Sequence, residues 1–322
     1  EKEKDFLALD LKSEQLIIFD FLDESNRSIY IRNSLKNDKN KFLVFDINPI
    51  PHAKKPVKAK IKKYINLIFN KENLLSYFVD FFIYKNLKNN AYIPDISVVG
   101  GLSALKQVKA KNKIHAHNMD YDSYLQIKDF QSKRQEEPFA VFVDQDLVTH
   151  PDLKISYNGA PVTESNYYPA LINFFNNFKN LTGLNIKFAV HPRSRNKKIS
   201  HLLQGIDYSF GNTRDLIKDS SLVLTHTSTA ISLAMLFKKP TIILTSNELK
   251  KSWLGNQISD FAKFTNMEAI NIDQNLNTQI NLKELLKVNE EKYQRYIDQY
   301  VKMPNSPNLP LWKIISDYLT NF

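Results

Sequence analysis

The feature that most constrains the fold of this chain is a repeated alternation of short apolar runs with polar turns in its second half. The run Ile186–Val190 is followed at once by the polar turn His191–Arg195. A second run, Leu222–Leu224, leads into Thr225–Thr229, and a third begins at Thr241 after an apolar stretch with helical spacing. Short apolar runs bounded by polar turns and separated by helical segments are typical of buried parallel strands. The pattern therefore predicts an α/β fold.

The same alternation in the first half predicts a second sheet. Apolar runs occupy residues 16–21, 41–46 and 96–99, and another follows the charged, proline-terminated stretch Ser132–Pro138. That stretch has the composition of an interdomain linker. We therefore expect two Rossmann-like domains facing a cleft. The expected boundaries are residues 1–135 for an acceptor-side domain, 136–303 for a nucleotide-binding domain, and 304–322 for a terminal helix that crosses back.

Composition sets the broad class of the protein. The chain has 322 residues, of which 43% are hydrophobic and 24% charged, as in ordinary globular proteins of two domains. It has no cysteine, which excludes disulfides, thiolate metal sites and a cysteine nucleophile. No apolar run is long enough for a transmembrane helix, and the opening Glu1–Asp5 is not a secretory leader. We expect a cytoplasmic protein.

The formal net charge of +10 raises the question of an anionic partner. Lysines cluster between Lys54 and Lys63, next to the apolar side chains of Tyr64–Ile68. Such a basic amphipathic segment is either a solvated helix face or a peripheral contact with the inner surface of the cell membrane. The chain has no helix-turn-helix, zinc or RNP-like signature, so we expect no nucleic-acid partner.

Polar clusters after two of the strands predict an anion site. Thr227, Ser228 and Thr229 come where a helix is expected to begin, and His191 and the arginines Arg193 and Arg195 follow the neighbouring strand. Serine and threonine at such a position either cap the helix or bind a phosphate. Ligands of open parallel sheets bind outside the carboxyl ends of the strands. Three hydroxyls in a row, with basic side chains nearby, favour phosphate binding.

Carboxylates follow two other strands. Asp120 and Asp122 come after the short strand predicted at residues 113–117, where three roles are open: a metal ligand, a loop-stabilising group or a catalytic carboxylate. We expect the two side chains to diverge on an extended segment. Asp144 and His150 follow the strand at residues 139–143. His150 is either a catalytic acid or base or part of a capped turn.

These elements together resemble the GT-B glycosyltransferases of bacterial surface polysaccharide assembly. His191-Pro192 and Ser228-Thr229 look like the His-Pro and Ser-Ser/Thr motifs with which bacterial sialyltransferases bind CMP. The segments at residues 120–125 and 142–152 are similar to those of transferases related to retaining β-Kdo enzymes. The Asp/Glu-Asp/Glu-Gly motif of the inverting sialyltransferases is absent. The resemblance covers residues 95–245 and implies a CMP-activated donor.

The resemblance implies a glycosyltransferase that moves Kdo or a nonulosonic acid from CMP to a capsule or lipopolysaccharide glycan. It places the donor phosphate at His191, Arg193, Arg195 and the hydroxyl cluster Thr227–Thr229, without a metal or cofactor. The catalytic candidates are Asp120, Asp122, Asp144 and His150, with Asp120 first as a nucleophile that forms a glycosyl-enzyme intermediate. The alternatives are a transferase for UDP-sugars or CDP-glycerol, a UDP-sugar epimerase, and a two-domain binding protein.

Overall fold

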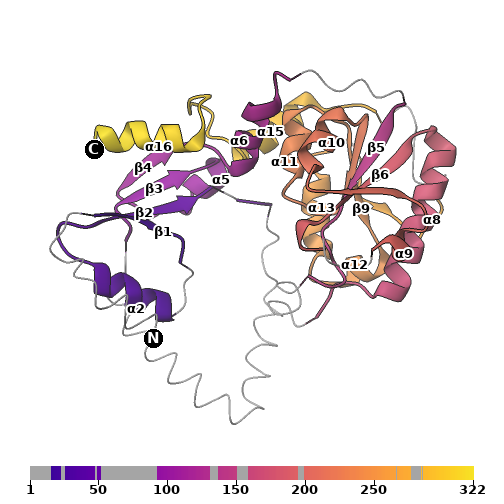
Figure 1. Cartoon of the computed structure of the whole chain (residues 1–322), viewed down its shortest axis with the longest axis horizontal. Coiled ribbons are helices and arrows are strands. Elements are labelled where there is room, and N and C mark those ends of the chain that lie inside the picture. The colour runs from indigo at the N-terminus through magenta and orange to yellow at the C-terminus, as the bar shows by residue number, and fades with distance from the viewer. Residues whose placement is uncertain are drawn as a thin grey trace, which may run out of the picture.

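The computed structural model contains two parallel β-sheets, each covered by helices, which confirms the predicted α/β class (Figure 1). It describes residues 16–22, 26–47, 49–51, 93–130, 137–150, 159–194, 199–265, 267–276, 284 and 286–322. The predicted basic segment at Lys54–Ile68, most of the Ser132–Pro138 linker and Arg195 lie outside these residues. Among the described residues, no helix is both long and apolar enough to span a bilayer.

The first sheet has the strand order β1-β2-β3-β4, and all its pairs are parallel. Its strands are β1 (Ile17–Asp20), β2 (Lys41–Asp46), β3 (Ile96–Val99) and β4 (Asn112–His115). The helices near it are α2 (Asn26–Leu35), α5 (Leu102–Leu105) and α6 (Met119–Ile127). β1, β2 and β3 fall on apolar runs of the sequence, and β3 is buried along its whole length, as expected of a strand covered on both faces. β4 has the sequence Asn-Lys-Ile-His and buries only Ile114.

The second sheet has the order β10-β9-β8-β5-β6-β7, again with parallel pairs. Its strands are β5 (Phe139–Val143), β6 (Asn185–Val190), β7 (Asp207–Phe210), β8 (Leu222–Thr225), β9 (Thr241–Thr245) and β10 (Ile270–Asn271). From β5 the chain builds β6 and β7 on one side, then crosses to β8, β9 and β10 on the other. The strand order thus reverses between β5 and β8, the position at which α/β sheets bind ligands.

Alternate side chains of β5 serve two different cores. Ala140 and Phe142 pack with the long helix α8 (Glu164–Thr182), while Val141 and Val143 pack with α10 (Thr213–Asp219) and α11 (Ile231–Leu236). The period of two along a strand explains this division. The other elements of this half are η1 (Pro192–Ser194), α9 (Ser200–Leu203), α12 (Asn247–Lys251), α13 (Gly255–Ala262) and α15 (Glu290–Tyr300). Both faces of the sheet are therefore covered.

The end of the chain returns to the first sheet. After α15, Val301 accepts a hydrogen bond from the backbone of Asn118 (2.8 Å), and Met303 donates one to Ala116 (2.9 Å). The last helix, α16 (Leu311–Thr320), then buries Leu311, Ile314 and Ile315 against the apolar face of β2, β3 and β4 (Figure 1). The core of the first sheet is thus completed by the final segment.

Two adjacent glycines allow close approaches of the backbone beside β3. A side chain at Gly101 would place its Cβ 2.6 Å from the carbonyl oxygen of Gln299 in α15, and Gly101 has a φ of 149°. A Cβ at Gly100 would lie 2.8 Å from the Cα of Ile47. Only glycine fits where backbones approach so closely. Gly101 therefore allows α15 to pack on the first half of the chain, and Gly100 allows close packing within that half.

The structure differs from the sequence-based expectation around Asp120 and Asp122. These residues lie in the first turn of α6 and not on an extended segment, because the side chain of Asn118 caps that helix by accepting the Tyr121 N–H at 3.1 Å.

Candidate functional site

The loops after β5 and β8 are joined by one glutamine at the point where the strand order reverses. Gln145 follows β5, and Thr227 follows β8. Oε1 of Gln145 accepts the backbone N–H of Thr227 at 2.7 Å, and Nε2 donates to Oγ1 of Thr227 at 3.1 Å. The hydroxyl cluster is therefore held in a defined position at the carboxyl edge of the sheet.

Asp144 ties the loop after β6 to the same edge. Its Oδ2 accepts the backbone N–H of His191 at 3.1 Å, and its Oδ1 accepts that of Asp146 at 3.0 Å. The side chain is buried, and this burial raises the pKa of the carboxyl to about 6 against the opposing effect of the N–H bonds. Both oxygens are occupied by the protein. The structure thus gives Asp144 a role in holding the two loops together.

His150, His191 and Arg193 form a basic group beside these loops. The rings of His150 and His191 meet edge to face with centroids 5.2 Å apart. Arg193 donates from Nη1 to Nε2 of His150 (3.3 Å) and from its backbone N–H to Nδ1 of His191 (3.3 Å). The guanidinium and the backbone N–H of Arg193 can only donate, so the ring nitrogens that they meet must accept. The neutral rings therefore carry their protons on Nδ1 of His150 and Nε2 of His191. Among the described residues, Nδ1 of His150 has no hydrogen-bond partner.

The hydroxyls of Thr227 and Ser228 are both fixed as acceptors. Gln145 donates to Thr227, and the backbone N–H of Ala230 donates to Oγ of Ser228 at 3.3 Å. In the part of the chain that the structure describes, neither hydroxyl proton has an acceptor. Thr229 beside them is exposed. The following helix α11 has only 6 residues.

Asp120 lies where α6 meets α11 and α15. Its carboxylate hydrogen-bonds the hydroxyl of Ser232, which also bonds Tyr296 of α15. Burial raises the pKa of Asp120 to about 6, and the Ser232 bond only partly offsets it. Ser232 belongs to the first turn of α11 and donates its backbone N–H to Thr229 at 3.0 Å. Asp120 is therefore linked through one serine to the hydroxyl cluster.

Asp122 points to a different part of the structure. Its Oδ1 accepts the backbone N–H of Leu311 at 2.9 Å and lies 3.9 Å from Nε2 of His117. Leu311 is the first residue of α16, and the residue before it is a proline that provides no side-chain cap. The carboxylate thus caps a helix far away in sequence.

Two further residues that support the edge were not predicted as site residues. His226 is fully buried, donates from Nδ1 to the carbonyl of Leu244 at 2.8 Å, and accepts from the hydroxyl of Tyr167 at 2.9 Å. Burial lowers the pKa of His226 to about 4, so the ring is neutral. Gln145 is the second. The sequence offered only their place at the ends of strands as a signal.

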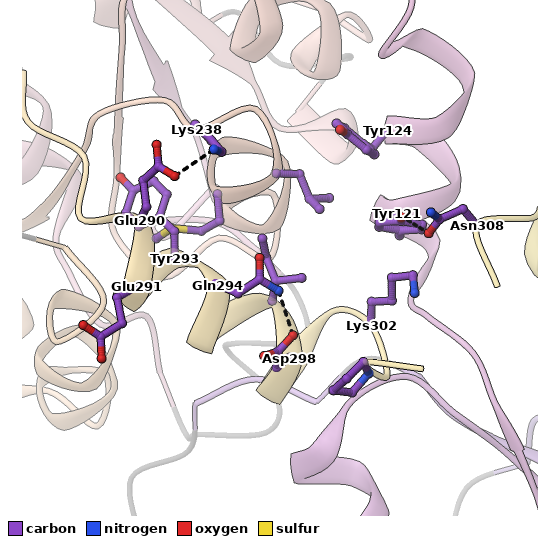
Figure 2. Close-up of a pocket in the computed structure, with 14 residues that line it drawn as sticks. Tyr121, Tyr124, Lys238, Glu290, Glu291, Tyr293, Gln294, Asp298, Lys302 and Asn308 are labelled. Atoms are coloured by element: carbon purple, nitrogen blue, oxygen red, sulfur yellow. Dashed lines mark hydrogen bonds and ion pairs between the residues drawn. The ribbon is translucent and has the colours of Figure 1, made fainter. Parts of the chain in front are cut away.

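A groove of about 590 Å³ lies between α6, α11 and α15. Figure 2 shows Tyr121 and Tyr124 of α6 on one side and Glu290, Glu291 and Asp298 of α15 on the other. Of the described residues that line it, none belongs to the predicted site. The groove therefore marks where the two halves of the chain meet.

Comparisons with known proteins show similarity to solved structures alone. No protein-family model and no curated protein sequence matches the chain. The structure of S. aureus MnaA with UDP is similar with a TM-score of 0.47 and 14% identity, over 99% of this chain and 80% of that one. The UDP-GlcNAc 2-epimerase from Methanocaldococcus jannaschii gives a TM-score of 0.44 and 11% identity, over 95% and 76%.

A third similar structure is a variant of the wall teichoic acid polymerase TagF, with a TM-score of 0.46 and 11% identity over 89% of this chain and 71% of that one. Similarity at this level does not identify an activity. The function of this chain has to be inferred from its own residues.

Proposed function

We propose that this protein is a GT-B-type glycosyltransferase that moves a 2-keto acid sugar from a CMP-activated donor to a surface glycan. The observation that carries the proposal is the convergence of hydrogen-bond donors at the β5/β8 switch point. Thr227 and Ser228 offer hydroxyl protons there, and the basic group of His150, His191 and Arg193 lies on the adjoining loops. A phosphate has only acceptor oxygens, so this set of donors matches it.

A CMP-activated 2-keto acid sugar carries two anionic groups, the phosphate and the sugar carboxylate. The hydroxyls of Thr227 and Ser228 would hold the phosphate, and the guanidinium of Arg193 suits either group because it can bind two oxygens at once. Hydrogen bonds to charged groups each contribute about 1.5–3 kcal/mol. A few such bonds are enough for micromolar binding of a nucleoside monophosphate, which corresponds to a binding free energy of about 8 kcal/mol.

Among the candidate carboxylates, Asp120 is the best nucleophile. Asp144 already accepts two backbone N–H groups and Asp122 caps α16, whereas Asp120, among the described residues, bonds a single hydroxyl, that of Ser232. With a pKa of about 6, Asp120 is mostly ionised at neutral pH, as a nucleophile must be.

In the proposed reaction, an oxygen of Asp120 attacks the anomeric carbon while the bond from that carbon to the phosphate oxygen breaks. CMP leaves with the electron pair, and its charge is stabilised by the donors at the switch point. The acceptor hydroxyl then attacks the same carbon and releases Asp120. Its proton passes to Nε2 of His150, which becomes available as a base when the guanidinium of Arg193 turns to the bound anion. Two inversions give net retention of configuration.

Isothermal titration with CMP, CDP, UDP and cytidine tests the nucleotide site. We expect CMP to bind, cytidine to bind at least tenfold more weakly, and Arg193→Ala to weaken CMP about tenfold or more. Lys179→Ala is the charge-matched control, because Lys179 is exposed near the end of α8, at the opposite edge of the sheet. Tighter binding of UDP or CDP than of CMP would favour the UDP-sugar or CDP-glycerol alternatives. Equal affinity for cytidine and CMP would refute the phosphate site.

A further inference from the structure

The side chain of Gln145 makes both of its hydrogen bonds to one residue, across two strands that are far apart in sequence. Its partners are the backbone N–H and the hydroxyl of Thr227, which follows 82 residues later. The amide lies at the switch point of the sheet, directly behind the proposed phosphate site.

The orientation of this amide follows from its partners. A backbone N–H can only donate, so the carbonyl oxygen Oε1 of Gln145 must face the N–H of Thr227. The NH₂ group must then face Oγ1 of Thr227 and donate to it. One lone pair of that hydroxyl is thereby occupied, and its proton is turned away from Gln145. Among the described residues, no group accepts this proton.

We propose that Gln145 is a positioning residue that aims the hydroxyl proton of Thr227 at the ligand and thereby makes the site selective for an acceptor-only phosphate. This inference rests on the proposed function, since it assumes that the phosphate of CMP is held at the same hydroxyls. Gln145 itself need not touch the nucleotide.

The substitution Gln145→Glu isolates this effect. An ionised glutamate of nearly the same shape still accepts the Thr227 N–H, but its second oxygen now also accepts, so it captures the hydroxyl proton and turns it away from the phosphate. We expect CMP affinity at pH 7.5 to fall about 10–100-fold, because a charged hydrogen bond is lost and a like charge is added. The affinity for cytidine, which has no phosphate, should change less than threefold.

The pH dependence of this variant separates positioning from simple loss of structure. When the pH falls toward the range where a glutamate is protonated, ordinarily about 4.3, its O–H can donate to Thr227 as the glutamine does. CMP affinity of Gln145→Glu relative to the native protein should therefore rise as the pH is lowered from 7.5 toward about 4.3, where half of the glutamate is protonated. Gln204→Glu is the matched control, because Gln204 is exposed at the opposite edge of the sheet and the same charge change there should leave both affinities unaltered.

The possible outcomes are distinct. If the native protein does not distinguish CMP from cytidine, the proposed phosphate site fails and this inference fails with it. If the native protein binds CMP but Gln145→Glu binds it equally well at pH 7.5, the phosphate site stands and the positioning role is refuted. Should Gln145→Glu not fold, Thr227→Val replaces it, since it keeps the backbone bond and removes only the hydroxyl. Undiminished CMP affinity in Thr227→Val would then overturn the inference.

Discussion

The carboxylate of Asp122 accepts a hydrogen bond from the backbone N–H of Leu311, a residue 189 positions later in the chain. It supplies the cap that the proline before α16 cannot provide. Replacing Asp122 with alanine should lower the free energy of unfolding by about 1–2 kcal/mol, the usual cost of a lost cap. Hydrogen exchange should show faster opening of α16, while CMP affinity stays unchanged. A loss of transfer activity without any change in the exchange of α16 would instead point to catalysis.

Replacing Asp120 should stabilise the protein and abolish its transfer activity. Burial raises the pKa of Asp120 to about 6, so the ionised carboxylate lowers the free energy of unfolding. This loss of stability begins as the pH rises above 3.8 and reaches its full value above 6. Asp120→Asn should therefore raise the free energy of unfolding at pH 7.5 by on the order of 1–3 kcal/mol, with little gain at pH 4. Transfer should be abolished and CMP binding retained.

Denaturant unfolding at the two pH values, paired with a radiolabelled transfer assay, measures both effects of Asp120→Asn. Asp207→Asn serves as the control, because this exposed aspartate lies at the start of β7, at the edge of the sheet opposite the site. Full turnover by Asp120→Asn would rule out the nucleophile role, whatever its stability.

His226 should make the protein sensitive to acid. Its pKa is lowered to about 4, so the unfolded chain binds a proton at higher pH than the folded one does. This contribution to stability is fully present above pH 6.5 and is lost as the pH falls from 6.5 toward 4. His226→Phe should be less stable at pH 7 by about 2–4 kcal/mol, because the bonds to Leu244 and Tyr167 are lost. Its melting temperature should then fall less on acidification than that of the native protein, as scanning calorimetry can determine.

The close approach at Gly101 can be tested with Gly159 as an internal control. Gly101 and Gly159 have similar φ values of 149° and 141°, but a Cβ meets the Gln299 carbonyl only at Gly101, and no atom lies within 4 Å at Gly159. Alanine at either position strains the backbone. Only Gly101→Ala should also push α15 away, so we expect it to lose at least about 2 kcal/mol more than Gly159→Ala in urea unfolding. Equal losses would show that α15 can shift freely.

The sheets could be predicted well from the sequence. The runs at residues 139–143, 186–190, 222–224 and 241–244 fall on β5, β6, β8 and β9 within one residue at each end. Strands covered on both faces are apolar throughout, and that signal is local. The helix around Asp120 was missed because its cause, the Asn118 cap, is a single side-chain contact in a segment rich in polar residues.

The site could be predicted only in outline. Its position at the strand ends follows from the α/β rule, but the pairing of Gln145 with Thr227 and of Asp122 with Leu311 joins residues 82 and 189 positions apart. Composition and spacing carry no information on such long-range bonds. The sequence analysis ranked Asp120 just ahead of Asp122. The structure separates them, because it links Asp120 through Ser232 to Thr229 and places Asp122 at the start of α16.

The return of α16 to the first sheet sets an order of events during synthesis. The apolar face of β2, β3 and β4 emerges from the ribosome first, yet Leu311, Ile314 and Ile315, which cover it, are made nearly 200 residues after β4. At about 5–20 residues per second, that face stays uncovered for at least roughly ten seconds. The first sheet is thus translated before the second but matures after it, and a nascent chain stalled before residue 311 should be held by chaperones.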